Sequence, residues 1–89
     1  MFKATVIVTL RRSILDPQGK AVHHALHNLG YTAVTQVRIG KVVELWIEAP
    51  TAQAAERIAH EAAEKLLANP VMEDFHVSVT PFEVATPAG

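Results

Sequence analysis

Residues 2–10 have the sequence FKATVIVTL, in which apolar and more polar side chains alternate over most of the stretch. Side chains two positions apart in a β-strand point to the same face. The resulting apolar face consists of Phe2, Ala4, Val6, Val8 and Leu10. β-Branched residues dominate the stretch, and they favour the strand conformation. The pattern therefore predicts a strand over 2–10 with one face directed at a hydrophobic core.

After this strand, Asp16 and Pro17 are typical of the start of a helix. An aspartate carboxylate accepts hydrogen bonds from the free N–H groups of the first turn, and proline is tolerated at the first helical position. Apolar residues then recur at helical spacing, at Val22, Ala25, Leu26 and Leu29. Gly30 follows where a left-handed cap would end the helix. A helix is expected over 17–29.

Two further strand patterns, at 34–39 and 42–48, are separated by Gly40 and Lys41. Two residues between alternating stretches are typical of an antiparallel hairpin. We expect the chain to turn at these two residues, so that the two strands pair with each other.

Thr51 is expected to cap a second helix over 52–68, which ends at Asn69 and Pro70. Its buried stripe is predicted to consist of Ala55, Ile58, Ala59, Ala62 and Leu66. Residues 75–80 alternate again and predict a fourth strand. The order β-α-β-β-α-β predicts an α+β, ferredoxin-like fold, an antiparallel sheet with both helices on one face. We expect one domain over 1–85 and a disordered tail over 86–89.

The chain has 89 residues, a net charge of −1 and no cysteine. A domain of this size has a thin core, and small domains gain stability from disulfides, metals or partner subunits. Disulfides and thiolate metal sites are excluded, so we expect a homo-oligomer. The balanced charge argues against electrostatic binding to nucleic acid or an anionic membrane. No apolar run approaches the roughly 20 residues of a membrane span, and a cytoplasmic location is expected.

With both helices on one face, the other face of the sheet is expected to be open. Its large apolar side chains are Ile7, Val42 and Trp46, and Phe82 and Val84 follow the last strand. An exposed indole within an apolar patch often marks a protein interface, although single exposed apolar residues are common. We expect these five residues to form the oligomer interface. An ordinary half-covered surface tryptophan is the alternative.

No set of side chains suited to catalysis is evident. His23 and His27 are spaced i,i+4, which supplies half of a zinc site, but the first helix offers no third ligand. A solvated helix face is the favoured interpretation. Neither Ser13 nor Ser78 stands in a nucleophile-elbow motif, and no phosphate-binding glycine motif is present. We expect no catalytic residue, no metal site and no cofactor in this chain.

Two segments are candidates for holding an anion or a partner's carboxylate. Residues 16–19 place free N–H groups at a helix start. Residues 38–41 put two cations around the expected turn. Ordinary helix capping and an ordinary turn explain the same residues, and spacing alone favours these simpler explanations.

Longer strings carry a resemblance to a known family. They are LDPQGKAV at 15–22, HALHNLGY at 24–31, VRIGK at 37–41 and EKLLANPV at 64–71. The chain resembles PurS, the small subunit of phosphoribosylformylglycinamidine synthase, over nearly its whole length. The resemblance implies a non-catalytic subunit in the fourth step of purine biosynthesis, where the complex uses ATP, Mg²⁺ and glutamine. It also implies a dimer, or a dimer of dimers, that bridges the large synthetase subunit PurL and the glutaminase subunit PurQ and supports ammonia transfer.

Within this resemblance, Arg38, Gly40 and Lys41 are the first candidates for subunit contacts, because a cationic turn can meet acidic groups on the synthetase. Asp16 and Gln18 are the second candidates. Two rival functions stay open. One is a dimeric regulatory module that binds a small metabolite. The other is an acylphosphatase, whose anion-cradling arginine only Arg11 and Arg12 could supply.

Overall fold

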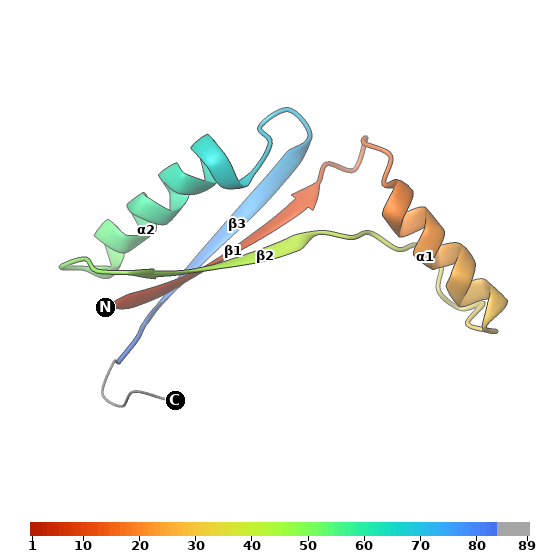
Figure 1. Ribbon diagram of the computed structural model, residues 1–89, viewed down its shortest axis with the longest axis horizontal. Helices are drawn as coiled ribbons and strands as arrows, with labels where there is room; N and C mark the ends of the chain where they lie inside the picture. The colour runs from red at the N-terminus through yellow and green to blue at the C-terminus, as the bar shows by residue number, and fades with distance from the viewer. Residues whose placement is uncertain (84–89) are drawn as a thin grey trace.

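The computed structural model describes residues 1–83 as an elongated molecule of 49 × 34 × 18 Å (Figure 1). Its elements, in chain order, are β1 (Phe2–Leu10), α1 (Pro17–Asn28), β2 (Lys41–Ile47), α2 (Ala52–Ala62), the single π-helical turn η1 (Ala63–Leu67) and β3 (Glu73–Pro81). Val84 and the tail expected over 86–89 lie outside the described residues. No helix within residues 1–83 has both the length and the apolar character needed to cross a bilayer.

The sheet is antiparallel, with strand order β2-β1-β3. β1 is the central strand. In the register, Ala4 lies opposite Leu45 and Val79, and Val6 lies opposite Val43 and Val77. Apolar residues of all three strands therefore meet on one face of the sheet.

Helix α2 covers this face and forms the core with it (Figure 1). The fully buried side chains are small: Ala4, Val6, Val8, Ala55, Ala59 and Ala63. Alanines on the inner side of α2 and η1 let the helix backbone come close to the strands. Thr51 caps the helix as predicted, since its Oγ1 accepts a hydrogen bond from the N–H of Ala54 at 3.1 Å. The expectation of a thin core is confirmed, because valine is the largest fully buried side chain.

The predicted hairpin is wrong. Residues 34–40 are not a strand, and the described part of the chain forms three strands in the order β-α-β-α-β. The chain passes Gly40 without turning back, and a Cβ on this glycine would lie 2.4 Å from the Val8 carbonyl oxygen. Arg38 and Ile39 are also hydrogen-bonded to the segment that follows β1. These contacts override the local turn preference and hold residues 34–40 in line with β2.

Helix α1 does not lie on the sheet, so the prediction of both helices on one face is also wrong. We call residues 11–40 the arm. In Figure 1 the arm carries α1 well beyond the ends of the strands, and Gly19 is the buried residue of this helix. The α+β class, the antiparallel sheet and the two helices are confirmed.

The predicted buried stripe of α2 is partly correct. Ala55 and Ala59 are buried, but Ile58 is 47% exposed and Leu66 is 82% exposed. The buried stripe continues through Ala63, four residues after Ala59, and then reaches Ala68. The π-helical turn, in which the N–H of Ala68 donates to the Ala63 carbonyl oxygen, adds one residue to the turn and leaves Leu66 outside the stripe. The exposure of Ile58 has another cause, the distance of α1 from the sheet, because within residues 1–83 no second helix lies beside α2.

Replacing Val6 and replacing Ile7 should have different effects, although they are neighbours on β1. Val6 is fully buried, whereas Ile7 is 41% exposed on the open face. We expect Val6→Ala to lower the free energy of unfolding by about 2 kcal/mol through lost burial and a cavity. Ile7→Ala is the control and should cost less than about 1 kcal/mol. Urea denaturation at one fixed protein concentration measures both, and equal losses would contradict the described sidedness of β1.

Candidate functional site

One buried carboxylate joins the start of α1 to the far end of the arm. Asp16 is 4% exposed, and its two oxygens accept hydrogen bonds from different segments. Oδ1 accepts from the N–H of Gly19 at 2.8 Å, which is the predicted helix cap. Oδ2 accepts from the N–H of Ile39 at 2.7 Å. Asp16 therefore fixes residue 39 against the first turn of α1.

These hydrogen bonds determine the ionisation of Asp16. The bond from the Ile39 N–H is the main reason that the pKa of Asp16 lies below its ordinary value of 3.8, and the bond from Gly19 acts in the same direction. Burial opposes this effect, while the positive charge of Arg38 adds to it. The carboxylate is thus held in its charged form by its own chain.

The guanidinium of Arg38 is also used within the chain. It donates to the carbonyl oxygens of Arg11 at 2.8 Å and Ile14 at 3.1 Å, with a longer contact to Leu10 at 3.4 Å. Leu10 is the last residue of β1, and the other two carbonyls belong to the segment that connects β1 to α1. Arg38 therefore supplies hydrogen bonds to otherwise free backbone carbonyls. Only the part of its side chain that is not used in these bonds is available to a partner.

Two glycines allow the segments to touch. A Cβ on Gly19 would lie 2.3 Å from the Val37 carbonyl oxygen, just as one on Gly40 would lie 2.4 Å from that of Val8. Contacts this short are incompatible with any other residue unless the backbone moves. We call this interlocked group the clasp: Asp16, Gly19, Arg38, Ile39 and Gly40.

A shallow groove of about 330 Å³ runs beside the clasp. It is lined by Leu10, Asp16, Pro17, Gln18, Ile39, Gly40, Lys41 and Glu73. The structure thus brings together Asp16, Gln18, Gly40 and Lys41, four of the residues predicted to contact a partner. Arg38 lines a separate hollow, with Gly19 and Val37. The ammonium of Lys41 has no ion pair within residues 1–83, so the groove offers one available cation to a partner.

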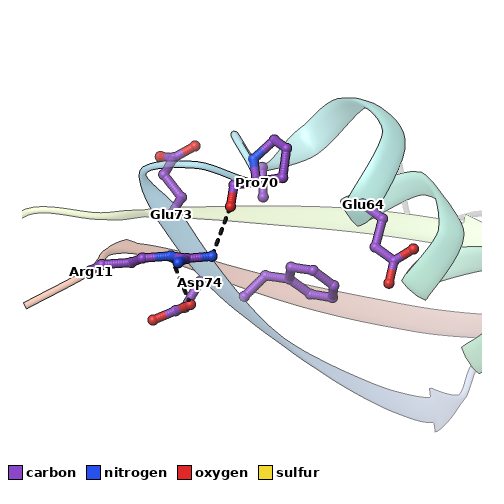
Figure 2. Close-up of a pocket in the computed structure, with 7 residues that line it drawn as sticks. Arg11, Glu64, Pro70, Glu73 and Asp74 are labelled. Atoms are coloured by element: carbon purple, nitrogen blue, oxygen red, sulfur yellow. Dashed lines mark hydrogen bonds and ion pairs between the residues drawn. The ribbon is translucent and has the colours of Figure 1, made fainter.

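A hollow of about 620 Å³ lies near the end of β1 and the start of β3 (Figure 2). Its lining includes Arg11, whose Nη2 donates to the Pro70 carbonyl oxygen at 2.7 Å and whose Nε lies 3.5 Å from Oδ1 of Asp74. Glu64 and Glu73 lie around the same hollow. This arginine is already paired and surrounded by carboxylates that would repel a phosphate. The hollow therefore argues against the acylphosphatase alternative.

The open face of the sheet carries two apolar groups. At one end the rings of Trp46 and Phe82 meet edge to face at 6.2 Å, and the Lys3 ammonium lies 5.6 Å from the indole centroid. Near the other end of the face Ile7 lies opposite Val42. Their exposed fractions range from 38% for Phe82 to 62% for Val42, so the predicted open face is confirmed for these four residues. Val84 lies outside the described residues.

The sequence did not indicate what His23 and His27 do. Their Nε2 atoms lie 2.8 and 3.3 Å from the carbonyl oxygen of Val34, and their rings are 4.6 Å apart. They hold the returning half of the arm against α1. The i,i+4 spacing was the available signal, but it did not reveal that the shared partner is a backbone oxygen. Within residues 1–83 no three His, Asp or Glu side chains gather as metal ligands would.

The clasp segments coincide with the strings that carried the family resemblance. The family model described as PurS, phosphoribosylformylglycinamidine (FGAM) synthase, matches residues 3–81. The synthase subunit PurS of Bacillus subtilis is 49% identical over 79 residues, covering 89% of this chain and 93% of that protein. The Synechocystis subunit is 44% identical and covers 94% of this chain and 84% of that protein. The chain belongs to the PurS family.

Solved structures of the family share this fold. PurS of Methanocaldococcus jannaschii has a TM-score of 0.85 at 35% identity, covering 93% of this chain and all (100%) of that one. A chain of the structure titled PurLQS from Thermotoga maritima has a TM-score of 0.80 at 31% identity, covering 90% of this chain and 99% of that one. The resemblance identified from the sequence is confirmed.

Asp16→Asn should destabilise the protein at neutral pH, because an amide group replaces one of the two accepting oxygens. The folded-state pKa of Asp16 is lowered, so its stabilising contribution is complete above the ordinary value of 3.8 and is lost as the pH falls through the folded-state pKa. We expect the wild type to have the higher Tm at pH 7 and this advantage to shrink in acid. Thermal unfolding followed by circular dichroism across this range measures it.

Asp74→Asn is the matched control, because the Asp74 side chain is 68% exposed and pairs with Arg11 only at 3.5 Å. It should change the Tm little at either pH. An equal loss in both variants, or a difference that does not depend on pH, would contradict the role given to Asp16.

Proposed function

We propose that this chain is the small subunit of phosphoribosylformylglycinamidine synthase, the enzyme of the fourth step of purine biosynthesis. In that reaction an ATP-dependent ligase converts the formylglycinamide ribonucleotide to its amidine with ammonia from glutamine. The chain would bridge the synthetase subunit PurL and the glutaminase subunit PurQ in the cytoplasm, supporting ammonia transfer while supplying no catalytic group. ATP, Mg²⁺ and glutamine are used by the other subunits.

The observation that carries this proposal is what Asp16 and Arg38 do, two polar residues within the strings that carry the resemblance. Asp16 and Arg38 are both bonded to backbone groups of their own chain. A general base or a substrate-binding guanidinium needs a free side to meet a substrate. These two residues thus maintain the shape of the chain, which is what a bridging subunit requires. The name PurLQS of the Thermotoga structure supports the partners, since it combines three subunit names.

The groove beside the clasp is the proposed contact with the synthetase. Lys41 and Gln18 are exposed and line it, while Asp16, Arg38 and Gly40 position its walls. An acidic group of the partner would pair with the Lys41 ammonium. The sequence predicts that Arg38 and Lys41 form one cationic turn, but Arg38 is bonded to the carbonyls of Arg11 and Ile14, and the proposed contact is therefore made by Lys41.

The open sheet face is the proposed second interface, between pairs of copies. Trp46 and Phe82 present exposed aromatic rings, and Ile7 and Val42 present aliphatic ones. Aromatic anchors within an apolar patch are typical of the energetic centre of an interface. With Val84 added, these residues would join two dimers into a dimer of dimers.

The direct test is reconstitution with PurL and PurQ from the same source, in the presence of glutamine and ADP. We expect the three proteins to elute together in size-exclusion chromatography. Glutamine-dependent amidine formation should require this chain, whereas the isolated chain should show no turnover. Turnover by the isolated chain, or no association with either subunit, would overturn the proposal. Stabilisation of the isolated chain by a metabolite would favour the regulatory-module alternative instead.

Lys41→Ala tests the groove without disturbing the clasp. Because exposed ion pairs contribute about 0.2–1 kcal/mol, the affinity for the synthetase should fall by up to about fivefold, with a weaker salt dependence. Lys65→Ala is the control, since Lys65 is an exposed lysine on η1. Isothermal titration at two salt concentrations measures both variants. Equal affinities for Lys41→Ala and the wild type would reject this contact.

A further inference from the structure

Two imidazole nitrogens and one backbone oxygen converge beside α1. The Nε2 atoms of His23 and His27 lie 2.8 and 3.3 Å from the carbonyl oxygen of Val34, and the two rings meet edge to face. The sequence offers only two ligands on this helix, and the expectation of no metal site rests on that count. The fold adds a third ligand atom from the returning half of the arm, a backbone oxygen that no side-chain spacing indicates.

The three atoms are spaced much as the ligands of one small divalent ion are. Zn²⁺ binds imidazole nitrogen and protein oxygen at about 2.0–2.2 Å, so neighbouring ligands lie about 3.4 Å apart around a tetrahedral ion. Around an octahedral ion they lie about 3.0 Å apart. The observed nitrogen–oxygen distances are close to this range. Rotating each ring by roughly 35–45°, the angle between a ligand–ligand edge and the line to the ion, would aim both nitrogens at one ion.

The end of α1 fixes the Val34 oxygen relative to the helix. Gly30 has a φ of 97°, which is the left-handed cap expected from the sequence. The N–H of Tyr31 donates to the Leu26 carbonyl oxygen at 2.9 Å, and that of Gly30 to the His27 carbonyl oxygen at 3.0 Å. The Val34 N–H then donates to the Tyr31 carbonyl oxygen at 3.3 Å. Backbone bonds thus place the third ligand atom opposite the histidines, which is the preorganisation that a metal site needs.

An open hollow of about 460 Å³ lies beside the histidine pair, lined by Lys20, His23, His24, His27 and Asn28. It gives the rings room to turn and gives an ion access to water for its remaining ligands. The Lys20 ammonium opposes a cation there, and no carboxylate is among these lining residues. With neutral ligands only, the affinity should be well below that of a thiolate site.

We propose that His23, His27 and the Val34 carbonyl oxygen bind one divalent transition-metal ion, with water in the remaining positions. Imidazole suits Zn²⁺, Ni²⁺ and Cu²⁺, whereas Mg²⁺ prefers oxygen ligands. Neutral imidazoles bind the ion through Nε2 with their protons on Nδ1, while the hydrogen-bonded form carries the protons on Nε2. Binding therefore replaces two hydrogen bonds by coordination and ties the returning half of the arm to α1. This site goes beyond the proposed function and does not depend on it.

Zinc titration of the untagged protein, freed of metal with EDTA and then dialysed, tests the site. Isothermal titration calorimetry with ZnCl2 should show one ion bound per chain with a Kd in the micromolar range. Zinc should also raise the Tm as its concentration increases, because an ion that binds the folded state stabilises it. MgCl2 at the same concentrations should do neither. Zinc binding only at millimolar concentrations would overturn the proposal.

His23→Gln and His27→Gln should each weaken zinc binding about tenfold or more, since losing even a residue that supports a ligand costs about 10–100-fold. His24→Gln is the matched control. His24 is exposed on the same helix and lines the same hollow, but among the side chains of residues 1–83 only His23 and His27 are hydrogen-bonded to the Val34 oxygen. It should bind zinc like the wild type. Equal weakening in all three variants would overturn the assignment of the ligands.

NMR on the wild type gives the answer even if a variant fails to fold. The ring resonances of His23 and His27 should shift together as ZnCl2 is added, and their nitrogen shifts should show coordination through Nε2. His60 is the internal comparison, because its Nδ1 lies 3.4 Å from the Glu64 carboxylate and this i,i+4 pair is another place where zinc could bind. Shifts confined to His60 or His24 would overturn the proposal.

Discussion

The Asp16 carboxylate is the constraint on which the rest of the structure depends. A single buried group accepts hydrogen bonds from Gly19 at the start of α1 and from Ile39 at the end of the arm. It thereby fixes the direction in which the chain leaves the first turn and enters β2. Arg38 adds to this constraint by binding the carbonyls of the connecting loop. With these bonds in place, residues 34–40 run straight and α1 stays away from its own sheet.

This constraint connects the strings that carry the family resemblance to the proposed role as a bridging subunit. Glycine is needed at positions 19 and 40 because the carbonyl oxygens of Val37 and Val8 lie where a Cβ atom would be. The role of both glycines is therefore close packing of the backbone. The charged residues of the clasp are bonded to backbone groups, which suits a protein that presents surfaces. The clasp positions the groove that Lys41 lines, and the sheet presents Trp46 on its open face. This arrangement agrees with the proposed role in binding partner subunits.

Much of this structure was predictable from the sequence, and the failures have physical causes. Alternation located β1 and β3, and capping residues located both helix starts, because these signals depend on neighbours in the chain. Alternation at 34–39 shows that a strand would be favourable but does not say which edge it joins. Gly40 suits a tight turn and a close backbone contact equally well, and only the position of Val8 decides between them.

The sequence predicted which residues form the candidate site better than it predicted what each of them does. Asp16, Gln18, Gly40 and Lys41 do meet in one groove. The sequence could not show that Arg38 is committed to loop carbonyls, because the bonds span 24 residues or more. The sequence also could not show that Ile58 is exposed, because its exposure results from the distance between α1 and the sheet.

The central claim is that the Asp16 carboxylate fixes the arm, and amide hydrogen exchange of the purified protein tests it most directly. The N–H groups of Gly19 and Ile39 donate to its two oxygens. The account predicts that both amides exchange slowly in the wild type and much faster in Asp16→Ala, while the amides of β1 are unchanged. Fast exchange of these two amides in the wild type would contradict it.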